Sequence, residues 1–210
     1  MHPQSRRRGD GAQVPCRRPW LPLAVIHILP VAIAYVIVVV CPQSISGGVA
    51  GQAALAIGAM IVHRVLSADM ALRCVTYRKA AIAVVGGVLY AWGVELMCNE
   101  QRVAVRLLSD MAGVDWVCMF AINAAWAASE EFFFRGSAWS ASANYVGPWW
   151  ATLMGSLSFA LFHFPASFTD AMVITGAAVL LCLLRIASGS IAPCIMWHFS
   201  YNAFVEWPSV

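Results

Sequence analysis

Residues 20–40 read WLPLAVIHILPVAIAYVIVVV, a stretch without a single charged side chain. An apolar run of about 18 residues or more can cross the hydrocarbon core of a bilayer as a helix. Such runs recur along the chain, of which 61% is hydrophobic and only 11% charged, whereas a soluble domain keeps roughly a quarter of its residues charged. Because backbone groups inside a bilayer must pair within their own segment, the sequence predicts an all-α polytopic membrane protein.

The apolar runs divide the chain into about seven predicted transmembrane helices. An Arg-rich start before an apolar stretch is also typical of a signal peptide, but this stretch is long for one and no A-x-A cleavage site follows, so we expect a retained anchor. Residues 1–19 are expected to form a disordered basic arm, and 99–113 an interfacial segment. The predicted spans are residues 20–40, 49–66, 80–97, 114–144, 148–164, 168–186 and 190–207.

The basic residues predict the orientation of these spans. Ten of the 13 lie on alternate connections, which the positive-inside rule places on the cytoplasmic side. The N-terminus is therefore expected in the cytoplasm, and the short loops suit a prokaryotic inner (plasma) membrane. A basic arm beside a membrane span usually sets topology, so no nucleic-acid partner is expected. The ten are Arg6, Arg7, Arg8, Arg17, Arg18, Arg64, Arg73, Arg78, Lys79 and Arg185.

Ionisable side chains inside the predicted spans gather in the second half of the chain. Residues 128–136 read ASEEFFFRG, residues 159–163 read FALFH, and residues 198–202 read HFSYN. Ionisable groups are costly inside a membrane and usually have a structural or functional role there. These three segments therefore hold the candidate site.

Helical spacing suggests a different role for each of these groups. Glu131 and Arg135 stand four residues apart with the acid first, which favours an ion pair that supports the site. Glu130 is turned about 100° away and lacks this partner, so it suits a general base. His198 and Asn202 also stand four residues apart and can offer two donors to one developing oxyanion.

The depths of the groups in the bilayer decide whether they can meet. Residues 137–144 are small, uncharged and compatible with a helix, so the fourth span is expected to continue to about residue 144. Glu130 then lies roughly 21 Å from the turn at residues 146–148, and His163 lies roughly 22 Å beyond that turn. The two side chains are therefore expected at the same depth.

EExxxR followed by Gly, then FxxxH, then HxxxN, in this order in a multi-span chain, resembles the CAAX protease and bacteriocin-processing (CPBP, or Abi) family, related to type II CAAX prenyl endopeptidase. Residues 184–193, LRIASGSIAP, are similar to the approach to HxxxN in that family. The likeness covers residues 114–204, and the first three spans carry no motif of the family. We therefore divide the chain into the arm (1–19), an accessory transmembrane region (20–113) and a catalytic transmembrane core (114–207) built from spans four to seven.

The resemblance implies a glutamic-type intramembrane endopeptidase, a hydrolase. By motif position, Glu130 and His163 would activate the hydrolytic water, and His198 and Asn202 would hold the oxyanion. Glu131 and Arg135 would brace the site. The substrate would be a membrane-associated peptide, and the sequence leaves prenylated tails, leader peptides and C-terminal sorting signals open.

The sequence leaves two alternatives to this prediction open, a metal site and a protein that is not an enzyme. No cofactor is expected, but Glu130, His163 and His198 would also form a His₂Glu zinc set, although the chain has no HExxH motif. The same polar cluster would serve a protein that is not an enzyme, such as a membrane scaffold, a bacteriocin-immunity protein or a transporter. Such a scaffold should tolerate Glu130→Gln.

Three polar residues outside the motifs have simpler expected roles. An isolated histidine in a span is often a hydrogen-bond partner between helices, which is our expectation for His27. His63 is expected at the membrane interface. Asn123 stands two turns before Glu130 on the same helix face, so it is a candidate to reach the site.

Overall fold

The computed structural model describes residues 20–40, 45–66, 72–97 and 116–205. Within these ranges every regular element is a helix, so the predicted all-α fold class is confirmed. The predicted basic arm and the interfacial segment at 99–113 lie outside the described residues.

The first three helices follow the apolar runs of the sequence. The helix α1 spans Trp20–Val40, α2 spans Ile45–Leu66 and α3 spans Tyr77–Met97. The bounds of α1 match the prediction, while α2 and α3 begin a few residues before the predicted starts. The additional residues, ISGG at 45–48 and YRK at 77–79, are mostly small or polar, so the apolar pattern does not mark them as helical.

The fourth predicted span is one unbroken helical rod made of three elements. The helix α5 (Trp116–Glu131) runs into a π-helix, η1 (Phe132–Ala138), and then into α6 (Trp139–Val146). The expected continuation beyond Arg135 is therefore present. The sequence did not predict the π-helix, an element that is rare and is often found at functional sites. It begins directly after the Glu-Glu pair.

The last three helices are separated by short, well-defined connections. Gly147, with φ of 82°, ends α6, and Pro148 occupies the first turn of α7, where its missing N–H costs nothing. The Ser167 hydroxyl accepts the Asp170 N–H at 3.0 Å and caps α8, and Gly189, with φ of 69°, ends it. The bounds are Pro148–Phe162 for α7, Phe168–Ser188 for α8 and Ala192–Val205 for α9.

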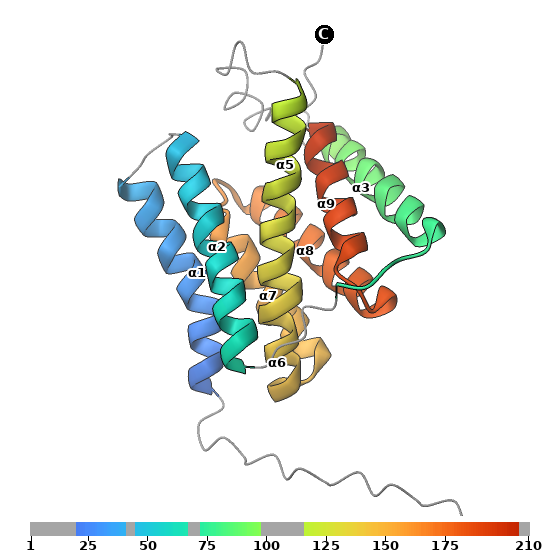
Figure 1. Cartoon of the computed structure of the whole chain (residues 1–210). Helices are drawn as coiled ribbons and strands as arrows, with labels where there is room; N and C mark the ends of the chain where they lie inside the picture. Colours follow the sequence, from blue (N-terminus) through green and yellow to red (C-terminus); the bar gives the residue numbers. More distant parts are fainter. Residues whose placement is uncertain (1–19, 41–44, 67–71, 98–115, 206–210) are drawn as a thin grey trace, which may run out of the picture.

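The helices pack so that segments distant in sequence meet around η1. Figure 1 shows α5 beside α2, with α1 on the outer side of α2 and with α3 and α9 on the opposite flank. The helix α5 packs against α9 and α2, and α7 packs against α1, α6 and α8. The ends of α5 and α7 and the middle of α9 therefore face one another next to α2.

A close contact between α3 and α9 holds the latter helix. A Cβ at Gly87 would stand 2.3 Å from the carbonyl oxygen of Trp197, so only glycine permits this approach. The Trp197 ring stacks on Tyr201 at 5.8 Å between centroids and lies 5.2 Å from Tyr90 of α3. Because His198 follows Trp197, this packing also positions a candidate site residue.

Two of the described helices are long and apolar enough to cross a membrane by length and composition, Tyr77–Leu96 and Phe168–Ser188. Large apolar side chains stand exposed on both, among them Trp92 on α3 and Met172 on α8. Exposed apolar surface of this kind suits contact with lipid. The number of seven spans remains a prediction.

Candidate active site

The two adjacent glutamates at the end of α5 face different partners. Glu131 is fully buried, and its Oε1 accepts hydrogen bonds from Arg135 Nη1 at 2.9 Å and from His198 Nδ1 at 2.8 Å. The ion pair expected from the i,i+4 spacing is thus present, and it extends to a ring on another helix. One carboxylate thereby orients both a cation and an imidazole.

Arg135 is enclosed by aromatic rings as well as by its carboxylate. Its guanidinium carbon lies 4.1 Å from the centroid of Phe159 on α7, and the side chain is 1% exposed. A desolvated cation over a ring face gains about 2 kcal/mol. Arg135 therefore connects η1 to α7, the helix that ends directly before His163.

Glu130 has a different environment for each of its two oxygens. Oε1 accepts a hydrogen bond from Gln52 Nε2 at 2.8 Å. Oε2 is buried and receives no hydrogen bond from the described residues, but it faces His163 Nε2 at 3.6 Å and His198 Nε2 at 3.8 Å. These two separations are too long for direct hydrogen bonds, and a group placed between the three atoms would contact all of them.

The hydrogen-bond partners assign the proton on each imidazole. His163 Nδ1 lies 2.8 Å from the carbonyl oxygen of Phe159, which only accepts, so Nδ1 carries the proton. His198 Nδ1 likewise donates to the Glu131 carboxylate. The Nε2 atom of each ring is therefore the one that faces Glu130 Oε2.

The structure brings most of the sequence-predicted site residues together, but not all of them. Glu130, Glu131, Arg135, His163 and His198 form one connected cluster. Asn202 lies one turn after His198 on α9, half-buried, and makes no hydrogen bond to the described part of the chain. Asn123 is buried on α5, and its Oδ1 has no partner among the described residues.

His27 is a structural residue between three helices, as its place in an apolar span led us to expect. Its Nδ1 lies 3.1 Å from the hydroxyl of Ser158 on α7, and its Nε2 lies 2.9 Å from the hydroxyl of Ser142 on α6. The ring thus connects α1 to α6 and α7 away from the acidic pair. His63 lies in the last turn of α2 and is exposed.

Gln52 is the contact that sequence reasoning missed. It lies on α2, in the region without a motif, and reaches Glu130 across the helix interface. An amide within an apolar helix is a signal in its own right, because polar groups are costly in a bilayer unless they find a partner. The sequence alone does not say which partner that is.

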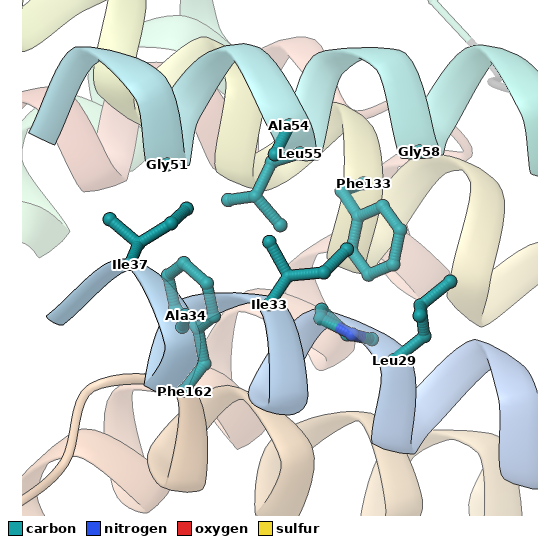
Figure 2. Close-up of a pocket in the computed structure, with 11 residues that line it drawn as sticks. Leu29, Ile33, Ala34, Ile37, Gly51, Ala54, Leu55, Gly58, Phe133 and Phe162 are labelled. Carbon is teal, nitrogen blue, oxygen red and sulfur yellow. The ribbon is translucent and has the colours of Figure 1, made fainter. Parts of the chain in front are cut away.

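An apolar groove adjoins the site between α1 and α2. Figure 2 shows Leu29, Ile33, Ile37 and Leu55 pointing into it. Phe133 and Phe162 complete the lining, the second of which precedes His163 in the chain. The groove thus presents an apolar surface next to the residue that precedes His163.

The described residues contain no group of three or more His, Cys, Asp or Glu side chains that could hold a metal ion. The cluster combines a carboxylate oxygen of Glu130 that lacks a donor among the described residues, two imidazoles and a buried ion pair. Such a set can bind and deprotonate a water molecule and can stabilise negative charge nearby.

Comparison with known proteins finds a family model that matches the part of the chain holding most of these residues. Residues 112–204 match the family model described as type II CAAX prenyl endopeptidase Rce1-like. The match confirms the resemblance seen in the motifs. No curated protein and no solved structure matches the chain.

Proposed function

Since residues 112–204 belong to the type II CAAX prenyl endopeptidase Rce1-like family, a family of membrane-embedded proteases, we propose that this chain is a glutamic-type intramembrane endopeptidase. It hydrolyses a peptide bond in a membrane-associated peptide or protein tail. One observation carries the mechanism: the buried Oε2 of Glu130 has no donor among the described residues and faces two imidazole nitrogens.

The proposed general base is Glu130. A water molecule between Oε2 and His163 Nε2 passes a proton to Oε2 while its oxygen forms a bond to the scissile carbonyl carbon. The π electrons of the carbonyl move onto its oxygen. The proton held by Glu130 then goes to the amide nitrogen as the carbon–nitrogen bond breaks, leaving a carboxylic acid and an amine.

The proposed donors to the oxyanion are His198 and Asn202. Because His198 Nδ1 already donates to Glu131, its Nε2 can donate only when the ring carries both protons. A charged His198 balances the cluster, since the two glutamates then face one arginine and one imidazolium. The Asn202 amide, one helical turn away, supplies the second donor.

The proposed role of Glu131 and Arg135 is to hold this arrangement. Glu131 orients His198 through Nδ1, and Arg135 compensates the charge of Glu131 in a buried setting. The catalytic residues are thus supplied by the core at 114–207, which we propose comprises spans four to seven of a seven-span protein. No resident cofactor takes part in this scheme.

The proposed substrate enters from the membrane. The apolar groove between α1 and α2 suits a hydrophobic stretch of the substrate beside the cleaved bond. Prenylated tails, leader peptides and C-terminal sorting signals all provide one. We place the protein in a prokaryotic inner membrane with its N-terminus in the cytoplasm, and we propose no nucleic-acid partner.

A purely structural cluster explains the site less well. A scaffold is expected to pair its buried polar atoms, because each unpaired one costs about 1–3 kcal/mol. Glu130 Oε2, like Glu131 Oε2 and Arg135 Nη2, is buried without a hydrogen bond from the described residues, and it also faces the Nε2 atoms of two imidazoles. A position kept open for water in a hydrolase accounts for this oxygen directly.

The test compares Glu130→Gln with Glu95→Gln, a matched change at an exposed position on α3. Each purified variant is reconstituted in liposomes with quenched-fluorescent peptides of the three substrate classes. We expect Glu130→Gln to lose at least nine-tenths of the cleavage rate while keeping its unfolding temperature, and Glu95→Gln to remain active. A fully active Glu130→Gln variant would indicate the scaffold, immunity or transporter role instead.

A further inference from the structure

Gln52 lies on α2 and contacts the proposed general base from outside the family-matched segment. Its Nε2 donates to Glu130 Oε1 at 2.8 Å. Among the described residues, no other group donates a hydrogen bond to the Glu130 carboxylate, and its Oε2 accepts none. The orientation of that carboxylate therefore depends on α2.

The amide of Gln52 is itself oriented by a neighbour of Glu130. The hydroxyl of Ser129 donates to Gln52 Oε1. The hydroxyl donor at the amide oxygen and the carboxylate acceptor at the amide nitrogen both require the same orientation of the amide group, with its NH₂ toward Glu130. Ser129 also lies 2.9 Å from the Trp126 carbonyl, an alternative acceptor for the same proton.

The helix α2 is held in place by contacts that do not involve Gln52. The Ser137 hydroxyl of η1 donates to the Ala59 carbonyl at 2.9 Å. Gly58 lies against Phe133, where a Cβ would come within 3.2 Å of the ring. The packing of α2 on η1 thus does not require the amide, which leaves the contact with Glu130 as its specific role.

We infer that Gln52 is a positioning residue for the proposed reaction, holding Glu130 so that Oε2 points between the Nε2 atoms of His163 and His198. This inference rests on the proposed function. A hydrogen bond at Oε1 restricts rotation of the carboxylate and keeps its free oxygen on the water side. Small displacements of a reacting group lower rates strongly, because the reaction depends on near-attack geometry.

Gln52 belongs to the region at 20–113, outside the matched residues 112–204. If it positions the base, the family-matched segment does not contain the whole site. The first helices then contribute to the chemistry as well as to the groove.

The test uses Gln52→Met in the full-length protein, because methionine keeps the length and unbranched shape of glutamine and removes the donor. The matched control is Ala53→Met, which places methionine at the adjacent exposed position of α2. We expect Gln52→Met to lower kcat by roughly 10- to 100-fold, with KM and the unfolding temperature unchanged. Ala53→Met should behave as wild type, and Ser129→Ala should show a smaller loss in kcat.

Two outcomes would overturn the inference: an unchanged kcat in Gln52→Met, or a loss of kcat that follows a fall in unfolding temperature. Glu130→Gln in the same assay separates this from the proposed function, which fails if that variant is active. In that case an experimental structure of Gln52→Met still decides the positioning role. We expect the Glu130 carboxylate to turn away from His163, and a carboxylate that keeps its place would refute the role.

Discussion

His198 and Glu131 are joined by a hydrogen bond of 2.8 Å between Nδ1 and Oε1, which determines that the other ring nitrogen faces the site. The bond crosses from α5 to α9, and Arg135 shares the same carboxylate oxygen. The supporting pair and the proposed oxyanion donor are therefore one unit. Changes to Glu131 should affect both stability and catalysis.

Glu131→Gln is expected to lower the free energy of unfolding by about 3–5 kcal/mol, because it leaves the buried Arg135 without a counter-charge. Arg135→Met should have a similar effect, because it leaves the buried Glu131 carboxylate without its arginine partner. The double variant should recover part of the loss, since no isolated charge remains. Chemical denaturation in detergent measures all three, with Glu95→Gln as the exposed control. An unchanged midpoint for Glu131→Gln would contradict the burial argument.

Asn202→Ala is expected to lower kcat by about 10²–10³, with a small effect on KM, if its amide donates to the oxyanion. Ser200→Ala serves as control, because the Ser200 hydroxyl donates to Met196 within the same helix, at 2.7 Å. Steady-state kinetics on both variants provides the measurement. Equal rates for the two would remove Asn202 from the oxyanion site.

Chelation by EDTA or phenanthroline is expected to leave peptide cleavage unchanged, because Glu130 and His163 activate water directly in the proposed scheme. The assay uses the purified wild-type protein in liposomes, with dialysis to remove the chelator. Activity that is lost and then restored by zinc would instead indicate a His₂Glu metal site.

Gly87→Ala is expected to destabilise the protein by about 1–3 kcal/mol, because the new methyl group would overlap the Trp197 carbonyl and push α3 from α9. Gly93→Ala lies on the same helix with no atom within 4 Å of the new Cβ, so it should be neutral or stabilising by about 0.5–1 kcal/mol. Thermal unfolding compares the two. Equal stability of the variants would contradict the close packing.

Thiol labelling of single-cysteine variants tests the predicted orientation. Cys74 follows α2 on the predicted cytoplasmic side, and Cys118 lies near the predicted outer end of α5; both are exposed. An impermeant maleimide should label Cys118 in intact cells and Cys74 only after permeabilisation. The reverse pattern would invert the topology and move the proposed substrates to the outer side.

Much of the architecture follows from the sequence because it depends on local patterns. Long apolar runs gave the bounds of α1, α3 and α8 to within a few residues, and Gly147 with Pro148 marked the turn after α6. The Glu131–Arg135 pair was also predictable, since helix periodicity alone brings residues four apart together. The depth match of Glu130 and His163 followed from the helical rise.

Other features were decided only by the packing of helices. Gln52 contacts Glu130, and His198 contacts Glu131, across interfaces between helices that are far apart in sequence. The rotation and offset of one helix against another depend on side-chain fit along the whole interface, such as Gly87 against Trp197. No local pattern encodes that fit, so these partners, and the π-helix beside them, became visible only in the folded chain.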